Sequence, residues 1–417
     1  MNKLVWKQFI LVVLMLFLAA CGSDDSETAP EVIPQYPPET NTSASQRGDW
    51  VSIKPLGTVA QSVYSLLLAL GQLPSIDSFD ARYGVGTYKV VYITEDTSGN
   101  LINASGVIAL PAKSTGALSP ILGYQHPTIF LDNKAPSNTA SNDAYTYIAA
   151  SLGYIMVLPD YIGYGESSNQ IHTYVHAQGL ANATVDMLRA AKQFLAHANI
   201  GWNGQLFLTG YSEGGYANMA AHRELETNLS AEFTVTAAVH GGGPYDVRGT
   251  MDTMLSSASL ASPAYVGFVF KAYDSIYGLN AIATAYQSQH VNIINTYYDG
   301  THSSSATDAK LGTTLVAGLY NSLFLIDYLA GGDVSYAPKF DANETYNWTP
   351  SAPTRLYHGQ YDDIVPYANA TTALAFMNGA PELELATCNI ILDAHALCAP
   401  GYLDYMIDYF NTKANNL

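Results

Sequence analysis

Charged residues and cysteines are scarce in this sequence, and each shortage excludes a class of protein. Only 12% of the 417 residues are charged while 48% are hydrophobic, a balance that excludes a disordered chain or a coiled coil and allows a large core. Lys and Arg number 17 against 35 Asp and Glu, so the formal net charge is −18. A chain this acidic repels phosphate backbones, which argues against a nucleic-acid partner.

The first 20 residues have the pattern of a signal peptide rather than a membrane span. Lys3 and Lys7 lead into the apolar run Phe9–Ala20, whose 12 residues are too few to cross a bilayer. The run ends in Leu-Ala-Ala-Cys21-Gly22, which resembles the lipobox of bacterial lipoproteins. That resemblance implies cleavage after residue 20, a lipid on Cys21 and, because Gly22 follows, the outer membrane of the cell envelope. The alternative is an ordinary secretory signal with a chance cysteine.

Residues 21–48 are predicted to be the lipidated cysteine and a disordered tether. Prolines at 30, 34, 37 and 38 lie among polar residues without an apolar period, and such chains stay extended. The tether would hold a folded domain off a membrane surface.

Only two cysteines remain beyond this segment, Cys388 and Cys398. In an oxidising compartment their spacing of ten predicts one disulfide, and a free buried pair is the alternative. A metal site would need more ligands than these. His172 and His176 lie four apart, but no third ligand or zinc-protease Glu accompanies them, so we predict no metal and no organic cofactor.

Continuous apolar runs followed by turn residues predict strands buried on both faces of a parallel sheet. The runs are Ile121–Tyr124, Tyr154–Pro159, Leu206–Thr209, Thr234–Val239, Arg355–Tyr357 and Asn389–Leu392. Helical segments such as Ala177–Ala198 alternate with them, which is typical of a doubly wound α/β fold. Upstream, Val59–Leu70 is predicted to be a helix that Gly71 and Pro74 end, and Tyr88–Thr94 with Ile102–Leu110 an antiparallel pair of strands.

One stretch interrupts the alternation. More than 100 residues separate Val239 from Arg355, and their pattern is helical or irregular. The part from Gly249 to Gly300 is rich in Tyr, and its only charged residues are Asp252, Lys271, Asp274 and Asp299. A structureless loop of that length is improbable, so we predict a helical cap. The expected organisation is an α/β core at 49–247 and 351–417 with the cap at 248–350. For any single aromatic of the cap, packing in the cap's own core is a simpler role than contact with a substrate.

The strongest chemical motif is Gly210-Tyr211-Ser212-Glu213-Gly214-Gly215. It follows an apolar strand and precedes a helical segment, which is the context of a nucleophile elbow. A serine on such a tight turn projects above the sheet, and the residues two before and two after it pass close to neighbouring backbone, where a Cβ would clash. Ser212 is therefore the predicted nucleophile.

A serine hydroxyl needs a base and a group that orients the base, each at the end of a later strand. Asp362 follows the strand at 355–358 and is the predicted acid, with Asp363 as its rival. His395 comes just after the run 389–392 and is the predicted base, whereas His358 is expected to be buried and structural. The Cys388–Cys398 bridge would clamp the segment that carries His395.

These motifs resemble those of a known superfamily. Ser212, Asp362 and His395, with H-G-x-x-D-x-x-V-P at 358–366, are similar to the α/β-hydrolases. The segments at 124–126, 160–165 and 210–215 resemble, more narrowly, the secretory lipases and related bacterial esterases, over roughly residues 80–417. Related peptidases share the triad motifs. The segment 160–165 is itself expected to be structural.

An oxyanion hole requires two backbone N–H groups aimed at the developing charge. Glu213 N–H, directly after the nucleophile, is the first candidate. Relatives usually carry His-Gly-Thr after the earlier strand, whereas this chain has His126-Pro127-Thr128, and proline has no N–H. The second candidate is therefore Thr128 N–H.

The sequence predicts a membrane-tethered serine hydrolase that cleaves carboxylic esters, with a small-molecule or lipid-like substrate. The sparse charge of the cap favours an uncharged acyl or aromatic ester. A serine peptidase or amidase of the same fold is the first alternative. A surface lipoprotein that binds ligands without catalysis is the second, and Pro127 is its only support.

Overall fold

The computed structural model describes residues 36–69, 81–139 and 147–417, which all belong to one compact unit, Ile33–Leu417. The predicted signal peptide, Cys21 and the first part of the predicted tether lie outside the described residues, as do Gly71 and Pro74. None of the helices described has both the length and the apolar content that crossing a membrane requires.

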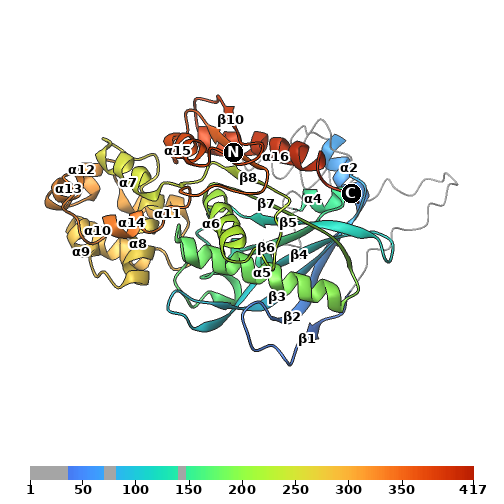
Figure 1. The fold of residues 1–417 in the computed structure, drawn as a ribbon. Coiled ribbons are helices and arrows are strands. Elements are labelled where there is room, and N and C mark those ends of the chain that lie inside the picture. The colour runs from blue at the N-terminus through green and yellow to red at the C-terminus, as the bar shows by residue number, and fades with distance from the viewer. Residues whose placement is uncertain (1–35, 70–80, 140–146) are drawn as a thin grey trace. The chain divides into compact units, whose positions relative to one another are not determined.

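A ten-stranded sheet forms the core of the described residues (Figure 1). Its strands lie in the order β1-β2-β3-β4-β6-β5-β7-β8-β9-β10. Pairing is antiparallel from β1 through β4 to β6 and parallel from β6 to β10. The strands are β1 Glu39–Thr40, β2 Trp50–Val59, β3 Val85–Glu95, β4 Leu101–Pro111, β5 Leu118–Gln125, β6 Ile155–Pro159, β7 Gly201–Tyr211, β8 Ala237–Gly241, β9 Thr354–Gly359 and β10 Glu384–Cys388.

Helices cover both faces of this sheet, which is why its central strands are apolar throughout. In β7, Phe207 packs with α16 and α4 on one face, and the next residue, Leu208, packs with α5 on the other. The core helices are α2 Gln61–Ala69, α3 Pro136–Thr139, α4 Ile148–Leu152, α5 Ala177–His197, α6 Glu213–Thr227, α15 Ala368–Phe376 and α16 Ala394–Asn411. The predicted doubly wound α/β architecture is thereby confirmed.

The chain between β8 and β9 forms a separate helical layer (Figure 1). Its helices are α7 Val247–Ser256, α8 Pro263–Tyr277, α9 Ile282–Ala285, α10 Ser288–Thr296, α11 Ser304–Leu311, α12 Val316–Leu319, α13 Ser322–Leu329 and α14 Ala337–Asp341. Phe270 and Tyr273 of α8 are fully buried and pack against Tyr336 and Phe340. These aromatics form the cap's own core, as the simpler interpretation of the sequence predicted.

The last strand is not where the sequence placed it. The run Asn389–Leu392 was expected to be a strand, but β10 ends at Cys388 and the run is an exposed loop in which Leu392 is 79% accessible. β10 lies at the edge of the sheet and is only partly buried, so its sequence, ELATC, lacks the continuous apolar character of a central strand. The sequence pattern therefore favoured a strand at the neighbouring apolar run, 389–392, over one at β10.

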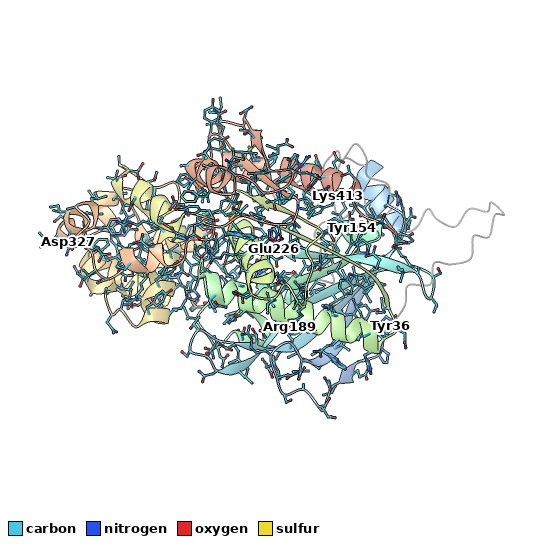
Figure 2. The ribbon with its side chains drawn as sticks, in the orientation of Figure 1. Tyr36, Tyr154, Arg189, Glu226, Asp327 and Lys413 are labelled. Carbon is cyan, nitrogen blue, oxygen red and sulfur yellow. A yellow bond between two sulfur atoms is a disulfide. The ribbon has the colours of Figure 1, made fainter. Side chains whose placement is uncertain are left out.

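The prediction of a disordered tether is wrong for the part of residues 21–48 that the structure describes. This part, from Tyr36 to residue 48, packs on the fold instead of staying free: Tyr36, which Figure 2 labels, contacts Tyr88 and Phe194 edge to face. Arg47 donates to the buried carboxylate of Asp186 at 3.1 Å. Strand β2, which follows, contains proline and glycine, and these residues weaken the sequence pattern of a strand.

Candidate functional site

Ser212 lies on the sharp turn between β7 and α6. Its backbone angles, φ 61° and ψ −126°, are ones that non-glycine residues rarely adopt. The turn is held from the next strand, because Ser212 N–H donates to the Gly241 carbonyl at 2.9 Å. The side chain is 9% accessible, so it is sheltered without being sealed off.

The glycines around Ser212 are required by close backbone contacts. A Cβ built on Gly210 would lie 2.2 Å from the carbonyl oxygen of Gly214. A Cβ on Gly214 would lie 2.1 Å from the Gln125 carbonyl oxygen, and both distances are impossible for a real side chain. The crowding expected two residues before and two after the nucleophile is therefore present.

The three residues predicted as a triad meet in space, although they come from three distant parts of the chain. His395 Nε2 lies 2.7 Å from Ser212 Oγ, and His395 Nδ1 lies 2.7 Å from Asp362 Oδ2. A carboxylate only accepts hydrogen bonds, so Nδ1 carries the proton and Nε2 is free to accept from the serine hydroxyl. The arrangement can remove a proton from Ser212.

Asp362 is held rigidly and kept ionised. Its Oδ1 accepts the backbone N–H groups of Ile364 at 2.9 Å and Val365 at 2.7 Å. Burial on its own would raise the pKa of this carboxyl, but hydrogen bonds and charge from His358 and His395 outweigh burial and hold the pKa well below its ordinary value. The carboxylate is therefore charged throughout the neutral range.

Asp363 and His358, which flank Asp362 in the sequence, make contacts of their own that differ from those of Asp362. Asp363, its rival in the sequence, accepts the backbone N–H of His395 at 3.0 Å rather than contacting the imidazole ring. His358 is fully buried, as expected, and its Nε2 lies 3.0 Å from the Val365 carbonyl oxygen. Asp363 thus helps to place the backbone of His395, and Asp362 contacts its ring.

Cys388 and Cys398 form the predicted disulfide, which is thereby confirmed. It joins the end of β10 to α16 and brackets the loop and first helical turn that carry His395. The Cys398 sulfur also lies 3.3 Å from the position of a Cβ on Gly359, at the start of the loop that carries Asp362. The bridge therefore lies next to the segments that carry the base and the acid.

Replacing both cysteines by serine should loosen this support. The disulfide closes a loop with a sequence separation of 10. Removing it lowers the free energy of unfolding of the protein by about 2–3 kcal/mol by the chain-entropy estimate. We expect a lower Tm and a kcat reduced roughly 10-fold, because His395 lies inside the bracketed segment. Thermal unfolding and ester turnover of Cys388→Ser/Cys398→Ser measure both effects, and an unchanged Tm and kcat would show that the bridge supports neither.

The two predicted oxyanion donors lie in segments that touch at the elbow. Glu213 is the first residue of α6, where N–H groups have no acceptor within the helix. The loop after β5 carries Thr128, and the carbonyls of Gln125, at the end of β5, and of His126, in the loop, approach Gly214. Thr128 Oγ1 lies 3.2 Å from the hydroxyl of Tyr174. The role of both N–H groups stays a prediction.

His172 has a partner that the sequence did not suggest. Its Nε2 lies 2.7 Å from Glu213 Oε1, while His176 caps α5 by accepting the Gly179 N–H at 3.1 Å. No cluster of three metal-ligating side chains occurs in the part of the chain that the structure describes. His172 and Glu213 are 41 positions apart, and no local pattern links them.

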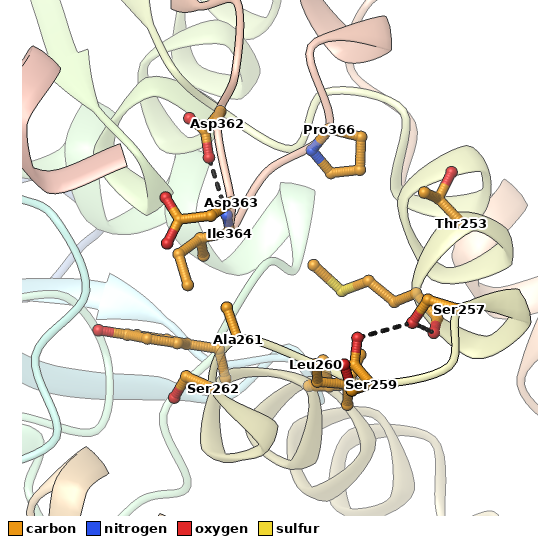
Figure 3. A pocket seen from close by; sticks show the side chains of 13 residues that line it. Thr253, Ser257, Ser259, Leu260, Ala261, Ser262, Asp362, Asp363, Ile364 and Pro366 are labelled. Carbon is orange, nitrogen blue, oxygen red and sulfur yellow. Dashed lines mark hydrogen bonds between the residues drawn. The ribbon is translucent and has the colours of Figure 1, made fainter. Parts of the chain in front are cut away.

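A cavity of about 210 Å³ lies between the cap and the loop that carries Asp362 (Figure 3). Its walls come from α7, α8, the loop between these helices and the acid loop, and only Asp362 and Asp363 among its lining residues are charged. Tyr265 of α8 lines it, unlike the cap aromatics that pack in the cap core. The lining residues are Thr253, Met254, Ser257, Ser259, Leu260, Ala261, Ser262, Tyr265, Val266, Asp362, Asp363, Ile364 and Pro366.

Comparison with known proteins finds lipases and esterases that are similar to this chain. Residues 133–295 match the family described as Secretory lipase. The chain is 22% identical to Lipase 10 of Candida albicans over 415 residues, covering 89% of this chain and 80% of that protein.

Solved structures give the same picture. The rice cell wall degrading esterase LipA from Xanthomonas oryzae superposes with a TM-score of 0.78 at 26% identity, covering 88% of this chain and 100% of that one. Candida antarctica lipase A in its closed state has a TM-score of 0.63 at 17% identity, covering 89% and 84%, and shares the fold.

Proposed function

We propose that this chain, an α/β-hydrolase similar to the secretory lipases, hydrolyses carboxylic esters through an acyl-enzyme on Ser212. The observation that carries the proposal is the unbroken chain of hydrogen bonds from Ser212 through His395 to Asp362, at 2.7 Å each. A serine with a base in contact and an acid behind that base is the arrangement that activates a weak nucleophile.

In the proposed mechanism His395 Nε2 takes the hydroxyl proton as Ser212 Oγ attacks the acyl carbonyl. Asp362 stabilises the imidazolium that forms and keeps its ring oriented. The N–H groups of Glu213 and Thr128 hold the developing oxyanion, and His395 then protonates the leaving alcohol. Water, activated by the same histidine, releases the acid and restores the serine.

The walls around the site support an uncharged ester as substrate. The cavity beside the acid loop is lined mainly by aliphatic, aromatic and hydroxyl side chains, apart from the two carboxylates of Asp362 and Asp363. Such a surface would disfavour the carboxylate terminus of a peptide, whereas its apolar part suits the acyl or alcohol part of a lipid-like ester.

The test is a comparison of ester and amide substrates. Purified protein is assayed on p-nitrophenyl esters from short to long acyl chains and, in parallel, on aminoacyl arylamides, with Ser212→Ala as the control. Ester turnover that disappears in the control supports the proposal, and the chain-length profile separates esterase from lipase. Preference for arylamides would favour a peptidase. No turnover and no labelling by a fluorophosphonate would favour a non-catalytic binding protein.

We also propose that the protein is anchored in the bacterial cell envelope, at the outer membrane, by a lipid on Cys21. The support is the lipobox-like sequence at 18–22, which lies outside the described residues. Cys21→Ser should lose metabolic labelling by palmitate and move from the membrane fraction to the soluble fraction. Unlabelled wild-type protein would exclude the anchor.

A further inference from the structure

The residue directly after the nucleophile carries a buried acid. Glu213 has a fully buried side chain, and its Oε1 lies 2.7 Å from Nε2 of His172, whose side chain is 3% accessible. A carboxylate at this position conflicts with the chemistry proposed for the site, because the backbone N–H of the same residue would have to stabilise a negative oxyanion. Two negative charges so close in a buried site repel each other.

The hydrogen bonds of His172 show how the conflict is avoided. Its Nδ1 lies 2.8 Å from the Ile162 carbonyl oxygen, which can only accept, so Nδ1 carries a proton. The contact between Nε2 and Glu213 Oε1 needs one further proton between the two atoms. Whether that proton belongs to the imidazole or to the carboxyl, the pair as a whole has no net charge.

The second oxygen of Glu213 supports a neutral pair. Among the residues that the structure describes, no hydrogen-bond donor reaches Glu213 Oε2, which is buried. An isolated carboxylate in such a place would be poorly stabilised, since burying an unpaired charge is costly. His172 therefore compensates the negative charge of the Glu213 carboxylate, which no other described hydrogen-bond donor at Oε2 stabilises.

We infer that His172 is a positioning residue of the oxyanion hole: it neutralises Glu213 by sharing one proton with it and so holds the Glu213 N–H in place for the oxyanion. This inference rests on the proposed function, because it assigns a part in that reaction to a residue that touches no reacting atom.

Aromatic rings that pack against His172 also contact the segment that carries Thr128, the second predicted oxyanion donor. His172 packs against Tyr164, at 4.6 Å between ring centres, and against Tyr174, at 5.9 Å. The Tyr174 hydroxyl lies 3.2 Å from Thr128 Oγ1. Tyr174 also stacks on Phe268 of cap helix α8 at 4.5 Å. One buried cluster thus contacts both oxyanion segments and the cap.

The test separates charge compensation from packing. His172→Gln in the full-length chain can still donate a hydrogen bond but cannot supply the compensating charge. We expect kcat for p-nitrophenyl esters to fall about 100-fold, the size of a lost oxyanion donor, with KM changed less than about 3-fold. The double variant His172→Gln/Glu213→Gln restores neutrality and should recover kcat to within roughly 10-fold of wild type.

His176→Gln is the matched control. His176 is a buried histidine four residues away that caps α5, and it forms no ion pair with an acid among the described residues. Its variant should keep kcat within about 3-fold of wild type, so that a general disturbance of this loop can be told apart from the loss of charge compensation.

Each outcome decides the matter. A double variant no better than His172→Gln would overturn the inference and leave His172 a packing role. If His172→Gln does not fold, a folded and active double variant supports the inference, and two unfolded variants overturn it. Wild-type protein without ester turnover or fluorophosphonate labelling would instead remove the proposed function, while a wild-type-like His172→Gln in an active enzyme removes only the inference.

Discussion

Ser212→Ala is expected to lower kcat/KM for esters by roughly 10⁴- to 10⁶-fold while leaving the fold intact. The hydroxyl is the only group the substitution removes, and its partner is His395 Nε2 at 2.7 Å. Alanine and serine meet the same backbone cost at φ 61°, so the elbow should keep its shape. Turnover of p-nitrophenyl esters, fluorophosphonate labelling and thermal unfolding measure the three parts of the expectation.

Ser256→Ala provides the comparison, because Ser256 is exposed and bonds only within its own helix. It should match wild type in turnover and labelling. A Ser212→Ala enzyme that retained more than about a tenth of the activity, or that still reacted with the probe, would remove Ser212 from the mechanism.

Asp362→Asn should reduce kcat by about 10³- to 10⁴-fold. The amide would donate to His395 Nδ1 instead of accepting from it, which moves the imidazole proton to Nε2 and leaves no base for Ser212. Asp363→Asn is the isosteric control: its amide oxygen can still accept the His395 backbone N–H, so we expect less than about a 10-fold loss. A larger loss in Asp363→Asn than in Asp362→Asn would reverse the roles.

The same pair of variants has a predictable pH dependence. The pKa of Asp362 in the folded protein is lowered, against an ordinary value of about 3.9 in an unfolded chain. Its contribution to stability is therefore complete above about pH 4 and is lost as the pH falls toward the lowered value. The difference in Tm between wild type and Asp362→Asn should accordingly shrink as the pH falls from about pH 4 to pH 2.

Several features could be predicted because their signals are local. The elbow at Ser212 combines a strand, a glycine-bounded turn and a helix within about 20 residues, and each part has its own pattern. The central strands are apolar because they are buried on both faces, and this pattern predicted a parallel sheet. The sheet topology and the similar solved structures confirm the predicted α/β-hydrolase fold. The two cysteines that follow Cys21 allowed one pairing with each other, and it forms. The lipid anchor and the domain boundaries at residues 1–35 stay predictions.

The predictions for the last strand and for the tether were wrong because the burial of these segments depends on residues that are distant in the sequence. β10 is an edge strand whose partial burial depends on having β9 as its neighbour, and the exposed apolar run at 389–392 competed with it. The segment that begins at Tyr36 has the composition of a tether, yet it is held by rings of β3 and α5 that are distant in sequence. Neither effect leaves a pattern within a short window.

The sequence by itself determined which residues could form a nucleophile, a base and an acid, because those side chains must follow strands and turns that local patterns mark. The tertiary structure decided what each of the two adjacent carboxylates contacts: Asp362 contacts the ring of His395, and Asp363 accepts the backbone N–H of His395, because the loop points them in different directions. It also decided that Glu213 meets His172 across 41 positions. A hydrogen bond between two buried polar groups depends on where the folded backbone brings them, and that is a property of the whole packed core.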